Sequence, residues 1–143
     1  MDDLNLAKKK LKENNLTLAI AKNGEIIFES NSEGIKDLIK AIDLFKKELN
    51  GAALADKIVG KAVALLCLYS KISSVFAETI SMLALQTLED SKIFVEYEKI
   101  VPKILNKRKD DICPFEKISL SLNSPSKAYE KFKSILSIHQ SRL

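Results

Sequence analysis

Glycine is scarce in this sequence, and its distribution excludes the common phosphate-binding loops. Only four glycines occur in 143 residues, and there is no tryptophan. A P-loop or a GxGxxG turn needs several glycines within one short loop that surrounds a diphosphate. The glycines here are scattered, so neither motif is present; they are Gly24, Gly34, Gly51 and Gly60.

Cysteine and histidine are also few, and their spacing predicts no metal site. The sequence has two cysteines, Cys67 and Cys113, and a single histidine, His139. No CxxC or HxxxH pair occurs, so a zinc site would need ligands from three distant elements. Two cysteines do not form a disulfide framework, which suits a reducing compartment. We therefore expect a cytoplasmic protein without metal or cofactor.

Long apolar runs are absent as well, and the charge is only mildly biased. The longest apolar stretch, 62–69, is far shorter than the roughly 18 residues of a membrane-spanning helix, so we expect no membrane partner. The net charge of +4 comes from 23 basic and 19 acidic residues spread over the chain. Such a distribution is typical of solvated helix faces, so we do not expect nucleic-acid binding. Length and composition predict one globular domain over 1–143.

The order of predicted elements indicates an α/β fold. Two β-rich runs flank Asn23-Gly24, which is typical of a type I′ turn, and predict a hairpin over 16–30. Helices and short strands then alternate, which indicates parallel pairing between strands. Helices are predicted over 2–14, 33–49, 55–71, 80–90 and from 125 onward, with strands over 73–78 and 92–97.

The segment 55–71, ADKIVGKAVALLCLYSK, contains the first candidate site. If Asp56 caps this predicted helix, Lys57 and Lys61 lie near its N-terminus, where cations oppose the helix dipole. Gly60 is unfavourable inside a helix, and its usual benefit is close approach of backbone or ligand. Two interpretations stay open: an anion-binding site, or a capped core helix with a packing glycine and solvated lysines.

The second candidate site is the polar stretch 106–116, NKRKDDICPFE. Cys113 precedes Pro114 and could be a reactive thiol at a helix N-terminus, where a thiolate is stabilised. It could equally be a small apolar residue beside a proline turn. Asn106 and Arg108 could bind a phosphate or carboxylate, or lie in an ordinary surface loop.

The runs DKIVGKAVALL and VPKILNKRKDDICPFEKI resemble an uncharacterised prokaryotic family, the domain of unknown function 1893, which is placed with the cytidine-deaminase-like proteins. The resemblance covers roughly 16–138. Its most specific part is the stretch 113–116 together with Val101-Pro102 and Asn106. It implies a three-layer αβα sandwich with a mixed sheet that begins with the hairpin.

Catalytic zinc deaminases have a His or Cys with a nearby Glu at one helix start and PCxxC at the next. In this sequence Asp56-Lys57 and 79–81 occupy those places, without a cysteine ligand. The resemblance therefore implies that both helix N-termini face one sheet edge and favour a nucleotide-derived or other anionic ligand. The expected ligand-binding residues are Gly60, Lys61, Thr79, Ser81, Asn106, Arg108, Cys113 and Glu116.

Whether the chain is an enzyme stays open. If it is catalytic, Asp56 is the candidate base or nucleophile and Lys57 stabilises charge. Cys113 and Glu116 would then surround these two residues. The alternative is a non-catalytic oligomeric or regulatory module in which the motif residues serve packing. A homo-oligomer is compatible with either function.

Overall fold

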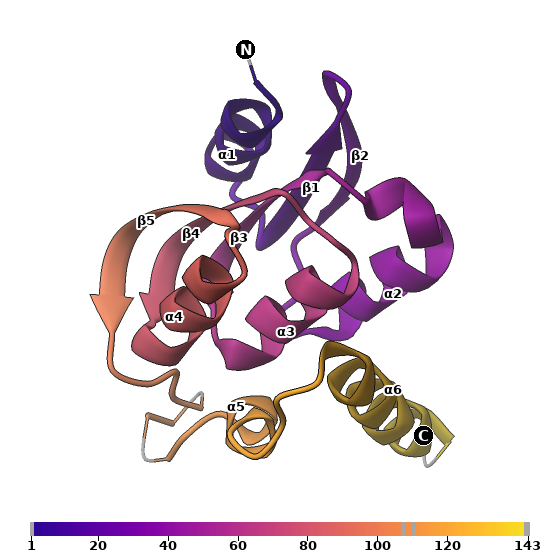
Figure 1. The fold of residues 1–143 in the computed structure, drawn as a ribbon, viewed down its shortest axis with the longest axis vertical. Coiled ribbons are helices and arrows are strands. Elements are labelled where there is room, and N and C mark those ends of the chain that lie inside the picture. Colours follow the sequence, from indigo (N-terminus) through magenta and orange to yellow (C-terminus); the bar gives the residue numbers. More distant parts are fainter. Residues whose placement is uncertain (1, 107, 110, 142–143) are drawn as a thin grey trace.

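A mixed five-stranded sheet forms the centre of the protein (Figure 1). The computed structural model describes residues 2–106, 108–109 and 111–141. In the order β2-β1-β3-β4-β5, β1 pairs antiparallel with β2 and β3, whereas β3, β4 and β5 are parallel. The strands are β1 (Leu18–Lys22), β2 (Glu25–Ser30), β3 (Ala53–Val59), β4 (Ser74–Ser81) and β5 (Phe94–Val101). The helices are α1 (Asp3–Glu13), α2 (Lys36–Phe45), the 3-10 helix η1 (Lys46–Leu49), α3 (Lys61–Tyr69), α4 (Met82–Asp90), α5 (Pro114–Ser119) and α6 (Pro125–Ser141).

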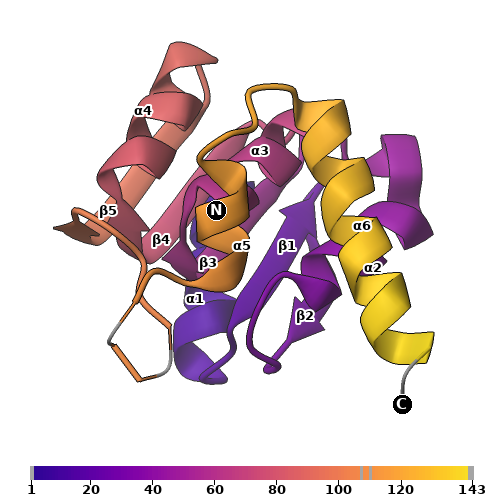
Figure 2. The same cartoon turned by 90° about the horizontal axis from the view of Figure 1, so that it is seen from below.

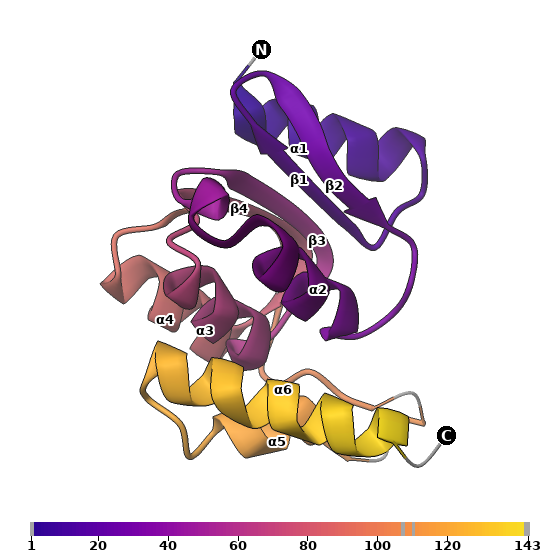
Figure 3. The same cartoon turned by 90° about the vertical axis from the view of Figure 1, so that its right-hand side faces the viewer.

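Helices cover both faces of the sheet. Figure 3 shows α1 on one face and α2, α3 and α4 on the other. The last two helices, α5 and α6, pack on the outer side of α3 (Figures 2 and 3). Helix α3 is therefore enclosed between the sheet and the C-terminal helices, and residues 61–67 are all buried. The predicted αβα sandwich with a mixed sheet is confirmed.

Small side chains allow α1 to lie close to the sheet. Four alanines and Phe76 form the buried surface beneath α1, together with Leu4, Ala7 and Leu11 of the helix itself; the alanines are Ala19, Ala21, Ala53 and Ala55. At the margin, Lys8 lies 2.6 Å from Glu96 and Lys12 lies 2.8 Å from Glu98. These ion pairs are solvent-exposed, so the apolar contacts provide most of the stabilisation.

The hairpin prediction is confirmed. Both residues between β1 and β2, Asn23 and Gly24, have positive φ angles, 54° and 81°, as a type I′ turn requires. The turn is also fixed from outside, because the carboxylate of Asp3 accepts hydrogen bonds from the N–H groups of Asn23 (3.0 Å) and Gly24 (2.8 Å).

The predicted helix over 55–71 is wrong in its first part. Residues Ala53–Val59 form β3, the central strand of the sheet, and α3 begins only at Lys61. Strand β3 lies between β1 and β4, residues 53–55 are buried on both faces, and alanine at 53 and 55 fits the narrow space under α1. Tertiary packing therefore determines its conformation more than intrinsic propensity does.

The remaining predictions differ from the structure mainly at their ends. Strands β4 and β5 extend further than predicted, to Ser81 and Val101, and the predicted helix over 33–49 ends as α2 plus a 3-10 turn. Pro125 begins α6, as expected from a proline at the first helical position. No helix in the described part of the chain combines the length and apolar character needed to span a bilayer.

Candidate functional site

Helices α3 and α4 begin side by side at the carboxyl edge of the parallel strands. Val59 at the end of β3 is paired with Ile80 of β4, and the next residues, Gly60 and Ser81, are the caps of the two helices. The hydroxyl of Ser81 accepts a hydrogen bond from the N–H of Ala84 at 3.1 Å. The expectation that two helix N-termini meet at one sheet edge is therefore correct for these residues.

The N-terminus of α3 is capped by a side chain from α5. The N–H groups of Lys61 and Ala62 donate hydrogen bonds to the carboxylate of Glu116. Gly60 has no side chain of its own to cap the helix, and a Cβ built on it would lie only 1.7 Å from Oε2 of Glu116. The missing side chain of Gly60 thus leaves the space that the Glu116 carboxylate fills.

Glu116 and Lys61 are both buried although both can carry charge. Glu116 is 6% exposed and Lys61 is 8% exposed. Burial raises the pKa of Glu116, while the two backbone N–H groups and the Lys61 ammonium act in the opposite direction. The ammonium of Lys61 also lies 3.5 Å from Oδ1 of Asn123, in the turn between α5 and α6. No sequence motif indicates the contribution of Asn123.

Asp56 is not a helix cap, because it lies within β3 and is paired with Leu18 and Ala77. Burial of its carboxyl group raises its pKa to about 7, although the N–H groups of Ile58 and Lys57 donate to it and act in the opposite direction. Burial, and to a smaller extent the negative charge of Asp56, raises the pKa of the Cys67 thiol on α3. Asp56 is thus a half-buried residue of β3 whose carboxyl group titrates in a largely protein-filled environment near Cys67 of α3.

Lys57 does not join the carboxyl-edge cluster of Gly60, Lys61, Ser81 and Glu116. Its ammonium donates to Oδ1 of Asn15, just after α1, at 3.0 Å. Thr79 is a half-buried residue of β4, paired with Ile58 and Lys99. The structure therefore brings together Gly60, Lys61, Ser81 and Glu116, but it places Lys57 elsewhere.

The other predicted residues lie in the approach to α5. Cys113 is the half-buried residue that precedes Pro114 at the start of that helix, and its N–H donates to Ile104 O at 3.0 Å. Asn106 is half-buried and its N–H donates to Asp111 O, whereas Arg108 is exposed. These contacts hold the chain near α5, which places Glu116 against α3.

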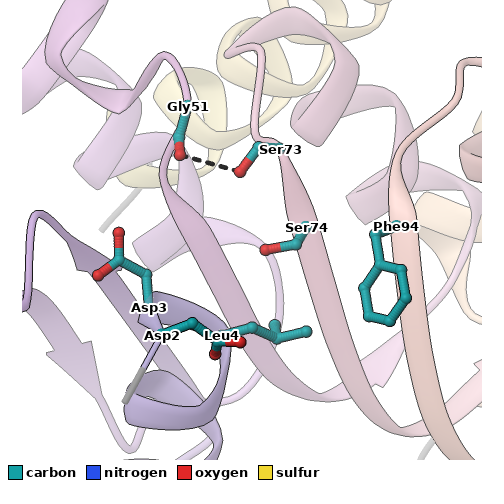
Figure 4. Close-up of a pocket in the computed structure, with 7 residues that line it drawn as sticks. All are labelled: Asp2, Asp3, Leu4, Gly51, Ser73, Ser74 and Phe94. Carbon is teal, nitrogen blue, oxygen red and sulfur yellow. Dashed lines mark hydrogen bonds between the residues drawn. The ribbon is translucent and has the colours of Figure 1, made fainter.

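A pocket of about 270 Å³ lies at the opposite end of the sheet (Figure 4). It is lined by residues at the starts of α1, β3, β4 and β5, which are Asp2, Asp3, Leu4, Gly51, Ser73, Ser74 and Phe94. The hydroxyl of Ser73 donates to Gly51 O at 2.9 Å within it. The pocket is therefore separate from the carboxyl-edge cluster and contains none of the predicted site residues.

Across the described side chains, no three His, Cys, Asp or Glu residues come close enough together to hold a metal ion. The side chain of His139 lies outside the described part of the structure. Among described residues, Glu116 is held by backbone N–H groups and by the charge of Lys61, which is an environment for a carboxylate and unsuited to a cation.

The fold and the carboxyl-edge cluster define an open-sheet α/β protein, and comparison with known proteins gives its family. The model of the domain of unknown function 1893 matches residues 6–136. The chain belongs to this family. A crystal structure of a DUF1893 family protein from Thermotoga maritima is similar, with 30% identity, coverage of 92% of this chain and 88% of that chain, and a TM-score of 0.80. A search of curated proteins finds no match.

Proposed function

We propose that this protein is a deaminase-like domain that binds a small anionic, nucleotide-derived ligand at the carboxyl edge of β3 and β4. The observation that supports this proposal is the Glu116 carboxylate itself. It occupies an anion position formed by the N–H groups of Lys61 and Ala62, beside the space left by Gly60. A phosphate or carboxylate that displaced the Glu116 carboxylate would be favoured there for the same reasons, because the helix N-terminus and the nearby Lys61 cation attract an anion.

The buried ammonium of Lys61 gives this proposal a direct test. Lys61→Met keeps most of the apolar stem but removes the charge, so we expect it to weaken the binding of cytidine 5′-monophosphate or inorganic phosphate at least tenfold. Isothermal titration calorimetry measures the affinity. Lys57→Met is the matched control, because the Lys57 ammonium contacts Asn15 instead, and its affinity should equal that of the wild type.

Intact mass under native and denaturing conditions, combined with a metal assay, tests the same proposal on the purified protein. A retained anionic ligand of a few hundred daltons supports it. Stoichiometric zinc would contradict the expectation that the protein has no zinc site. If neither cytidine 5′-monophosphate nor inorganic phosphate bound the wild type, the proposed ligand class would be wrong.

A second candidate is a non-catalytic module in which the same residues serve packing. It is favoured by the internal partners of the predicted residues: Glu116 caps α3, Ser81 caps α4, and Lys57 contacts Asn15. In that case Lys61→Met changes stability or self-association, and neither the wild type nor any variant binds the two probes measurably. Size-exclusion chromatography with light scattering, run beside the calorimetry, distinguishes the two.

A further inference from the structure

Helix α5 is short, and its apolar side chains Phe115 and Ile118 are only partly buried where they pack against the main core. It has six residues, too few for a stable helix without tertiary support. Its buried residues are Glu116 and Ser119, and the Ser119 hydroxyl donates to Glu116 O, within the helix, at 2.6 Å. Among the described side chains of α5, Glu116 thus makes the polar contact that ties this helix to α3.

Helix α6 is fixed at several independent points. Ala128 and Phe132 are fully buried in the main core. The ring of Tyr129 stacks on Tyr69 of α3, with centroids 4.4 Å apart and ring planes at 8°. Its hydroxyl donates to the carboxylate of Asp43 on α2, and Lys133 lies 3.2 Å from the same carboxylate. Helix α6 therefore has anchoring contacts to α2 and α3 that do not involve α5.

We infer that α5 is a latch that opens while α6 stays docked, and that the Glu116 carboxylate at the N-terminus of α3 is the group that holds it closed. Phe115 of α5 meets Phe132 edge-on, with centroids 5.7 Å apart, and Ile118 packs on the same core, so opening separates these partly buried contacts as well. Opening exposes the N–H groups of Lys61 and Ala62 and the Lys61 side chain. The latch does not depend on the ligand proposed above, although it covers the same edge.

Native-state hydrogen exchange followed by NMR tests the latch in the full chain, because local opening and global unfolding give different exchange rates. The N–H of Lys117, bonded to Cys113 O at 2.9 Å, reports on α5. We expect Lys61, Ala62 and Lys117 to exchange at least tenfold faster than the interior amides of Leu66 in α3 and Phe132 in α6. Equal rates at all five positions, or rates at Phe132 as fast as those at Lys117, would overturn the inference.

The role of Glu116 is tested by the same readout in two variants. Glu116→Ala is expected to speed exchange at Lys61 and Ala62 at least tenfold and to leave Phe132 unchanged. Glu130→Ala, on the exposed side of α6, is the control and should leave the rates at all these amides unchanged. If Glu116→Ala speeds Phe132 as much as Lys61, the two helices open together and the latch is excluded. If Glu116→Ala does not fold, the exchange rates of α5 and α6 in the wild-type protein still test whether α5 opens separately.

Discussion

Glu116→Ala is expected to lower the free energy of unfolding by about 3 kcal/mol. The substitution leaves the N–H groups of Lys61 and Ala62 without their acceptor at a buried helix start, and it removes a side chain that fills the space beside Gly60. Urea unfolding followed by circular dichroism measures the change. A loss below about 0.5 kcal/mol, typical of a surface substitution, would contradict the capping role.

Glu116→Gln provides the matched comparison. Burial raises the pKa of Glu116, so its negative charge carries a desolvation cost and the stabilisation comes from the acceptor oxygen. Glutamine keeps one acceptor oxygen and the same shape without that cost. We therefore expect Glu116→Gln to retain most of the stability that Glu116→Ala loses, and an equal loss in both variants would show that the charge is essential.

Asp56→Asn is expected to remove most of the pH dependence of stability between about pH 4 and pH 7. The pKa of Asp56 is raised to about 7 in the folded protein from 3.8. Because the folded pKa is the higher one, the stabilisation is fully present below about pH 4 and is lost as the pH rises toward 7. This difference corresponds to about 4 kcal/mol at most. Asparagine does not titrate, so its stability should vary much less over this interval.

Urea unfolding of both proteins at several pH values from 4 to 8 measures this effect. Glu116 also has a raised pKa and contributes in the same direction in both proteins, so the difference between them isolates Asp56. Asp90→Asn, at the exposed end of α4, is the control and should follow the wild type. Parallel pH profiles for wild type and Asp56→Asn would show that the carboxyl group is not buried as described.

Local sequence signals predicted the elements that depend on local chemistry. Asn23-Gly24 specifies the hairpin because both residues adopt positive φ, and the proline at 125 marks the start of α6. Strand β3 could not be predicted in this way. Its alanines and the pair Asp56-Lys57 have low strand propensity, and its conformation depends on pairing with β1 and β4.

Four of the residues predicted for the candidate site lie together in the structure, but their arrangement could not be predicted; they are Gly60, Lys61, Ser81 and Glu116. Gly60 was expected to allow close approach, and the structure shows that the approaching group is Glu116. No local pattern connects these two positions, because α5 reaches α3 only through the packing of the C-terminal segment on the domain. The error in the start of α3 also placed Asp56 and Lys57 at a helix N-terminus, where Gly60 and Lys61 lie.

A double-mutant cycle between Gly60 and Glu116 tests the central claim most directly. Gly60 has a φ of −101°, which alanine adopts without strain, so the cost of Gly60→Ala comes from displacing the Glu116 carboxylate. We expect Gly60→Ala to cost about 1–3 kcal/mol in the wild type. In the Glu116→Ala background it should be neutral or stabilise by up to about 1 kcal/mol. Additive effects within about 0.5 kcal/mol would show that Gly60 does not provide the space for Glu116.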